Sequence, residues 1–291
     1  MQVALHFGAP YTDENRLQLC LGSNREALAE IGTIIPRPSS YRKTMRPVLT
    51  RFKDGTGDDA LRAEYLREVI GDQQADRVVL SNDTFLGIPR ASVGNDQFFP
   101  GPFNRIDALQ RLFDGAEIEL FYGLCNPATF IQGLLVNHPG EDIETLIGHS
   151  DPMQLRWSEF LGRIHAEFPH LQITAWCNED TPLIWDEVIR EIAGVDPMFQ
   201  LEGTHDFLKE LMSAEGFERF TEFLAQRPGM SEIQKRRVIA AFLEKFAAEE
   251  MLEEEVDYPG WTDMHVDTLT ELYDEDVFAI QSLPYVKFIS P

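Results

Sequence analysis

Cysteine is scarce in this sequence. Its three cysteines, Cys20, Cys125 and Cys177, lie far apart, and none belongs to a Cys-x-x-Cys pair. This spacing argues against a disulfide framework and against a thiolate metal site. The cysteine usage fits a reducing compartment best, and we therefore expect a cytoplasmic protein.

Long apolar runs are also missing. No stretch approaches the roughly 18 apolar residues that a membrane-spanning helix needs. The first residues lack the basic segment and the apolar run of a secretory signal. We therefore expect a globular chain that neither spans a membrane nor carries a leader.

Positive charge is in short supply. The 25 Lys and Arg residues are outnumbered by 49 Asp and Glu residues, which gives a net charge of −24. A nucleic-acid surface needs a basic footprint, so this balance argues against nucleic acid as a partner. It also argues against anionic membranes, and against highly anionic small ligands unless a local basic pocket overrides the overall field.

The motifs of metal and hydrolase centres are absent from the sequence. None of the seven histidines has a His-Glu-x-x-His or similar ligand spacing, and there is no Gly-x-Ser-x-Gly. We therefore expect no metal centre. One alternative is a divalent ion held by Asp13, Glu14 and Asp83, which could meet at the carboxyl edge of a sheet. Clustered carboxylates alone are weak support for it.

What the sequence does contain is an alternation of short apolar runs with helical patterns. Apolar, β-rich runs occupy residues 3–7, 77–80, 118–124 and 171–176, and apolar residues at helical spacing lie between them. Strands that alternate with helices favour an α/β fold, here a three-layer α/β/α sandwich with a mostly parallel central sheet.

The strands stop near residue 200, whereas apolar stripes at helical spacing continue beyond it. We therefore expect an α/β core over residues 1–200 and a helical C-terminal portion over residues 201–291 that packs on the core. Residues 283–289 are open to two interpretations, a closing strand or a tail.

Two long connections are predicted to be loops. Residues 34–53 are rich in Pro, Arg and Ser, and they hold Arg37, Arg42 and Arg46, which are candidates for contacts with an anion. The alternative is that these arginines pair with the acidic excess of the chain itself. Residues 85–103 are rich in Gly and Pro, and loops of that length are usually functional or mobile.

The first turn has the form of a phosphate-binding turn. Gly8 breaks the run at residues 3–7, and a helix is expected to start at Thr12 or Asp13 and to end near Ile31. A strand, a Gly turn and a helix form the arrangement in which backbone amides hold a phosphate. The residues within the turn therefore decide which ligand it can hold.

In part, this turn resembles that of the P-loop sulfotransferases, which use 3′-phosphoadenosine 5′-phosphosulfate (PAPS). In that family the strand is followed by Gly-x-x-Lys-x-Gly-Thr-Thr, and here the loop reads Gly8-Ala-Pro-Tyr-Thr-Asp-Glu-Asn. Gly8 matches, and Thr12 is compatible. The departures are Tyr11 for the family's Lys, Asp13 for its Gly, and Glu14 and Asn15 for its two Thr residues.

The third strand and its helix cap are similar to the family's 3′-phosphate site in the same incomplete way. The family has Arg, Pro and Ser, and this chain has Cys125, Pro127 and Gly133 at the corresponding places. The resemblance spans most of the chain as a pattern of elements. It implies a fold of the P-loop NTPase and sulfotransferase type, with cofactor contacts at Gly8, Thr12, Asn15 and Asn126.

The departures work against one activity in particular. The family's Lys would stabilise charge on the leaving phosphate, and Tyr11 cannot carry that charge. Asp13 and Glu14 place carboxylates where the anion would bind, although carboxylates at a helix start are themselves stabilising. Two like charges about 4 Å apart cost about 4 kcal/mol at an effective dielectric of about 20, or roughly a thousandfold in affinity. The loop is thus predicted to fill its own anion site.

Two hypotheses follow. In the first, the protein is sulfotransferase-like but has lost its grip on the cofactor, and it acts as a non-catalytic binding or scaffold protein through residues 37–53 and 85–103. In the second, it is a transferase that still uses PAPS or another nucleotide donor, with Thr12 and Asn15 donating hydrogen bonds and the arginines supplying charge. The sequence leaves open whether the partner is a small molecule or a protein, and whether the chain forms a homo-oligomer.

Overall fold

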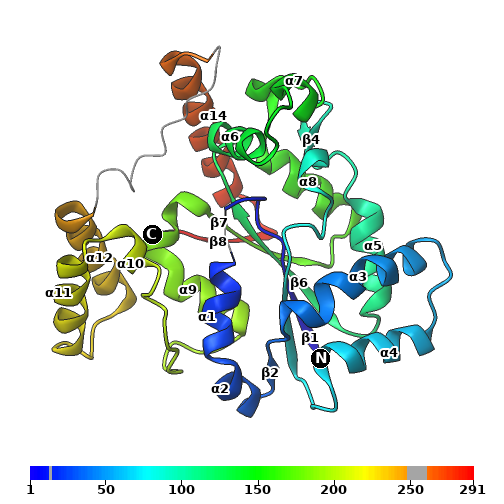
Figure 1. Ribbon diagram of the computed structural model, residues 1–291, viewed down its shortest axis with the longest axis horizontal. Coiled ribbons are helices and arrows are strands. Elements are labelled where there is room, and N and C mark those ends of the chain that lie inside the picture. The colour runs from blue at the N-terminus through cyan, green and yellow to red at the C-terminus, as the bar shows by residue number, and fades with distance from the viewer. Residues whose placement is uncertain (13–14, 248–260) are drawn as a thin grey trace.

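A six-stranded sheet forms the centre of the fold (Figure 1). The computed structural model describes residues 1–12, 15–247 and 261–291. The strand order is β2-β3-β1-β6-β7-β8, and every neighbouring pair is parallel. The strands are β1 (Gln2–His6), β2 (Thr33–Ile34), β3 (Arg77–Ser81), β6 (Glu117–Leu124), β7 (Gln172–Cys177) and β8 (Val286–Ile289).

Helices connect the strands and cover both faces of the sheet (Figure 1). Among the described residues, no helix has the length and apolar character needed to cross a bilayer. The helices are α1 (Arg16–Ser23), α2 (Arg25–Glu30), α3 (Pro38–Lys53), α4 (Asp59–Ile70), α5 (Phe103–Leu112), α6 (Pro127–Asn137), α7 (Ile143–Leu146), α8 (Trp157–Glu167), α9 (Thr181–Ala193), α10 (Leu208–Leu211), α11 (Ala214–Ala225), α12 (Glu232–Phe246) and α14 (Asp263–Gln281).

Alternating strand residues supply two cores, one on each face of the sheet. Val3 and Leu5 of β1 point into the larger core, which includes residues of α3, α5, α6, α8 and α14. Ala4 points to the other face, where α1, α2 and α9 pack. Because successive strand side chains point to opposite faces, one buried strand contributes to both layers. The chain is therefore an α/β protein with helices on both faces of a parallel sheet.

The order of the strands reverses at β1. From β1 the chain passes through α1 and α2 to β2 on one side, whereas from β3 it passes through α5 to β6 on the other. In open α/β sheets, ligands bind outside the carboxyl ends of the strands at such a reversal. The loop that follows β1 is therefore the candidate position for a ligand site.

The C-terminal part of the chain divides between the sheet and a small separate core. Helices α10, α11 and α12 bury their own cluster around Phe220. In contrast, α14 packs against α6 and α8, and β8 pairs with β7 at the edge of the sheet. Residues 283–289 therefore contain a closing strand, and part of the segment 201–291 belongs to the main α/β core.

The amino end of α8 is capped from a distant part of the chain. Arg156, the residue that precedes the helix, provides no side-chain cap. Instead, Asp276 of α14 accepts hydrogen bonds from the backbone amides of Trp157 at 2.6 Å and Ser158 at 3.2 Å. A carboxylate at this position satisfies free amides and complements the helix dipole.

The prediction of a loop over residues 34–53 is wrong, because most of the segment is the helix α3. Tyr41, Met45, Leu49 and Phe52 are buried at helical spacing, which gives the segment an apolar stripe. Pro38 suits the first turn of a helix, where its missing N–H costs nothing. The internal Pro47 is exposed, so water can satisfy the carbonyl that it leaves without a donor.

The prediction of a single helix from Thr12 or Asp13 to Ile31 is also wrong, because α1 and α2 form in its place. Helix α1 begins at Arg16 rather than near Thr12, and Asn24 separates it from α2. The Asn24 side chain donates to the carbonyl oxygens of Cys20 at 2.8 Å and Glu202 at 2.9 Å. An Asn side chain that bonds the backbone competes with helix propagation, which explains the break.

The Gly- and Pro-rich segment 85–103 is a packed connection. It contains a hairpin of β4 (Val93–Gly94) and β5 (Gln97–Phe98). Phe85 and Phe98 are buried, and Phe98 stacks on Trp157 with ring centroids 3.6 Å apart. The segment is therefore anchored to the core and does not form an open contact loop along its whole length.

Candidate functional site

The loop after β1 is hydrogen-bonded along the end of β6. The amide of Phe7 donates to the carbonyl of Phe121 at 2.9 Å, and the amide of Ala9 donates to that of Gly123 at 3.1 Å. Gly8 between them has φ +59°, which suits glycine. Pro10 has no amide proton at all. Ala9 and Pro10 therefore have no free backbone N–H with which this loop could bind a phosphate.

Thr12 closes the same loop from within. Its hydroxyl donates to the carbonyl of Ala9 at 2.7 Å. A hydroxyl has one proton to donate, so in this geometry Thr12 has none left for an anion. Asp13 and Glu14, which were predicted to occupy the anion site, lie outside the residues that the structure describes.

Tyr11 stands at the position of the family's Lys and packs against α6. A β-carbon at Gly133 of α6 would lie 3.6 Å from the β-carbon of Tyr11. The Tyr11 ring meets His138 edge-on, with centroids 6.3 Å apart. Burial, and to a lesser degree the negative charge of Asp83, raise the pKa of Tyr11. The loop thus holds a neutral ring near a carboxylate.

Arg42 joins the first loop to the end of β3. Its Nη1 donates to the side-chain oxygen of Asn15 at 2.7 Å, and its Nε and Nη2 donate to the carbonyl of Ser81 at 3.1 and 3.0 Å. Tyr41 donates to the same carbonyl at 2.8 Å. Arg42 is therefore the one predicted anion contact that reaches the loop, and neutral oxygens engage three of its nitrogens.

Asn126, at the carboxyl end of β6, caps the amino end of α6. Its side-chain oxygen accepts from the amide of Ala128 at 2.9 Å, and its side-chain nitrogen donates to Thr270 at 2.9 Å. Its backbone amide donates to Glu179 at 2.7 Å, and Tyr273 donates to the other oxygen of that carboxylate at 2.9 Å. Asn126 therefore ties α6 to α14, and its side chain is engaged at both ends.

The remaining polar groups at this edge are held in place. His6 is buried, stacks on Trp176 and lies 2.9 Å from the hydroxyl of Ser81 through its Nδ1. Burial raises the pKa of the Cys20 and Cys177 thiols to about 12. Since the thiolate is the reactive form, neither cysteine is an activated nucleophile at neutral pH.

The other predicted anion contacts lie away from the loop. Arg37 precedes α3 at its amino end, and Arg46 lies near Arg105 of α5, whose pKa is lowered by burial and by the charge of Arg46. Residues 37–53 hold six basic side chains, and none forms an ion pair with a carboxylate within the described ranges. They are Arg37, Arg42, Lys43, Arg46, Arg51 and Lys53.

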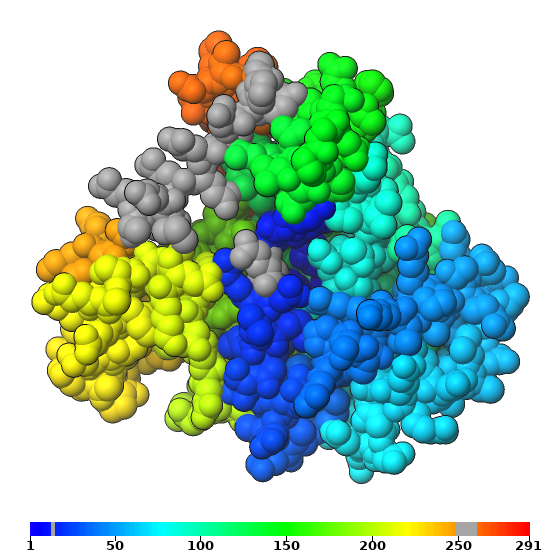
Figure 2. Space-filling model, viewed as in Figure 1, coloured from blue at the N-terminus to red at the C-terminus, as the bar shows by residue number. Residues whose placement is uncertain are grey.

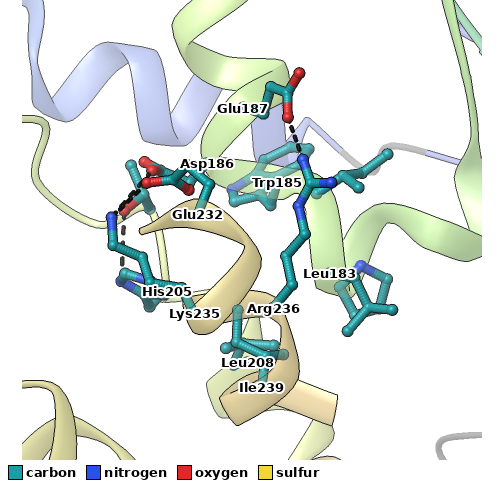
Figure 3. Close-up of a pocket in the computed structure, with 13 residues that line it drawn as sticks. Leu183, Trp185, Asp186, Glu187, His205, Leu208, Glu232, Lys235, Arg236 and Ile239 are labelled. Carbon is teal, nitrogen blue, oxygen red and sulfur yellow. Dashed lines mark hydrogen bonds and ion pairs between the residues drawn. The ribbon is translucent and has the colours of Figure 1, made fainter. Parts of the chain in front are cut away.

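A polar seam between α9 and α12 is too small for an organic ligand. Its cavity volume is about 10 Å³, which leaves room for one water molecule at most. Lys235 lies 2.7 Å from Glu232 and 3.8 Å from Asp186, and Arg236 pairs with Glu187 (Figure 3). These contacts fasten the C-terminal helices to α9 and leave no ligand site there.

Sequence reasoning missed the parts of the site that depend on long-range contacts. The hydrogen bonds from Tyr41 to Ser81 and from Tyr273 to Glu179 join segments far apart in the chain, and no local sequence pattern predicts them. Among the described residues, no group of three potential ligands could hold a metal ion. No family model matches the chain, and no curated protein does.

The buried Glu179 gives the site a testable pH dependence. Burial, its largest influence, raises the pKa of the carboxyl, so the folded protein holds this proton to a higher pH than the unfolded chain does. The associated stability is present below the unfolded pKa and is lost as pH rises through the folded pKa. We expect wild type to lose stability relative to Glu179→Gln over that interval, as measured by urea unfolding from about pH 4 to about pH 7.

The exposed Glu30→Gln variant supplies the baseline for that comparison. Its difference from wild type should change little over the same interval. A wild-type protein that gains stability over Glu179→Gln as pH rises would show that the buried carboxylate is not destabilised by its surroundings.

Proposed function

We propose that this protein is a non-catalytic binding protein of P-loop sulfotransferase-like architecture. The observation that carries the proposal is the closed loop after β1. The loop amide of Ala9 and the hydroxyl of Thr12 are both hydrogen-bonded within the protein. A nucleotide-binding turn needs such donors directed at the phosphate.

The charge around the loop supports the same conclusion. Tyr11 replaces the cation that sulfuryl transfer needs, and Asp83 lies near enough to raise the pKa of that tyrosine. A carboxylate beside the loop repels a phosphosulfate, and in a partly buried site this repulsion is weakly screened. The reversal of strand order at β1 supports the resemblance in architecture, because open α/β proteins bind ligands there.

The basic face of α3 is the proposed contact surface. On the face shown in Figure 2, α3 lies at the surface beside the segment that forms α1 and α2. Lys43, Arg46 and Lys53 are exposed, and none has a carboxylate partner within the described part of the chain. A local basic surface on a protein with net charge −24 favours a partner that presents anionic groups.

A second candidate is the transferase that uses PAPS through substitute residues, and the position of Arg42 favours it. Its guanidinium group contacts Asn15, which precedes α1. An anion could compete with the neutral oxygens that Arg42 contacts, because a phosphate carries a full negative charge and can pair with a guanidinium group through two parallel hydrogen bonds. In that case the arginine would supply the charge that Tyr11 lacks.

Calorimetric titration with 3′-phosphoadenosine 5′-phosphate separates the two candidates. For a non-catalytic protein we expect no binding at millimolar ligand, because Tyr11 replaces the family's Lys and both the Ala9 amide and the Thr12 hydroxyl are already hydrogen-bonded within the protein. Micromolar binding would overturn the proposed function and favour the transferase.

A restored loop provides the control. Tyr11→Lys combined with Asp13→Gly returns the family's cation and glycine, and it should create measurable affinity for the same nucleotide. If the double variant folds but gains no affinity, the resemblance at this loop does not reflect a lost nucleotide site.

A further inference from the structure

A cavity of about 420 Å³ lies beside β2, at the edge of the sheet. Strands β2 and β3 are paired, and within the described part of the chain β2 has no neighbour on its other side in the sheet. Residues of α2, of the amino end of α3 and of the carboxyl end of α4 line the cavity. Its volume falls within the range of sites for small organic ligands.

One wall of this edge cavity is apolar. Ile34, Ile35, Val69 and Ile70 line it, and Ile35 is only 1% exposed. Ala29 of α2 adds a small side chain to the lining. An apolar surface of this kind favours a hydrocarbon group, because each buried CH₂ contributes about 0.8 kcal/mol.

Two arginines add positive charge to the lining of the cavity. Arg25 donates through Nε to the carbonyl of Ile35 at 2.8 Å, and Arg37 lies at the start of α3. Within the described ranges, neither guanidinium forms an ion pair, although the protein is strongly acidic and Glu26 also lines the cavity. An arginine without a carboxylate partner matches the geometry of an incoming carboxylate.

We propose that the edge cavity binds an alkyl carboxylate of medium length, with its head group at Arg25 and Arg37 and its chain on the isoleucine wall. The proposal goes beyond the proposed function, because no residue of the loop after β1 lines this cavity. Titration with the nucleotide therefore does not test it. At physiological ionic strength the distant acidic residues are largely screened over about 8 Å, so the nearby arginines dominate the local field.

Titration of the full chain with sodium octanoate, followed by calorimetry, tests the proposal. Octanoate should bind, whereas acetate, which lacks the chain, and octanol, which lacks the charge, should bind at least about tenfold more weakly. Arg37→Gln should weaken octanoate binding about tenfold, because it removes one charge-assisted contact. Arg67→Gln, an exposed change on α4 that removes a positive charge outside the cavity, should leave the affinity unchanged.

A filling variant keeps the test independent of the arginines. Ala29→Trp should occupy the cavity and abolish octanoate binding while the circular dichroism spectrum stays that of the wild type. The proposal is overturned if octanoate does not bind the wild type, or if octanol binds as tightly as octanoate. It is equally overturned if a folded Ala29→Trp variant binds octanoate with unchanged affinity.

Discussion

Replacing Trp157 with alanine is expected to lower the free energy of unfolding by about 3–5 kcal/mol. The side chain is fully buried, and its ring stacks on Phe98 with an interplanar angle of 5°. Its indole nitrogen donates to the carbonyl of Cys125 at 2.7 Å. The change removes aromatic contacts and leaves a buried carbonyl without its donor, and both effects are costly. Urea unfolding followed by far-UV circular dichroism measures the loss.

The control for Trp157 is an aromatic side chain that buries little surface. Phe278 of α14 is 73% exposed, and Phe278→Ala should change stability by no more than about 0.5 kcal/mol. If the two variants lose similar amounts of stability, the cluster around Trp157 is not the centre of the core.

Replacing Arg77 with methionine should destabilise the protein by about 3–5 kcal/mol. Arg77 is 5% exposed and forms an ion pair with Glu119 of β6. It also donates to the carbonyl of Ile192 and to the side chain of Gln2, each at 2.9 Å. The substitution leaves a partly buried carboxylate without its cation, which costs more than the pair itself contributes. Urea unfolding at neutral pH measures the effect.

Two further variants separate charge burial from packing. Arg77→Met combined with Glu119→Gln should recover part of the stability, because the second change removes the unpaired charge. Arg111 pairs with Asp107 at the surface, so Arg111→Met should cost no more than about 1 kcal/mol. No recovery in the double variant would indicate that Arg77 acts by filling space.

The elements that the sequence predicted well are those with strong local signals. Residues 3–7 and 118–124 are short apolar runs, and they correspond to β1 and β6. Ser231 and Gln234 form a capping box at the start of α12, a signal that lies within four residues of the sequence. Gly194 ends α9 in the left-handed conformation. Each signal is contained within a few residues, so a single sequence suffices to reveal it.

The elements that were missed depend on partners elsewhere in the chain. Helix α3 was hidden because its prolines and arginines dominate the composition, while its apolar stripe becomes meaningful only when the sheet is present to cover it. Strand β2 has two residues, too few for a periodic pattern. The break at Asn24 depends on a contact with Glu202, far along the chain.

The same limit applies to the candidate site. The resemblance drew attention to Gly8, Thr12 and Asn15, and the structure places all three near the carboxyl end of β1. It could not indicate which donors are already engaged, because that depends on the register between β1 and β6 and on the reach of Arg42. Residue identity suggested where a ligand would lie, but hydrogen bonding decides whether there is room for one.

The late position of β8 in the chain has a consequence during synthesis. Strand β7 ends at Cys177, yet its outer neighbour begins only at Val286. Any sheet that forms while the intervening residues are being translated lacks the hydrogen-bond partner that β8 supplies to the outer edge of β7. Such an unpaired sheet edge can pair with strands of other nascent chains. Slow elongation through this interval would therefore favour aggregation on the ribosome, and chaperone binding there would oppose it.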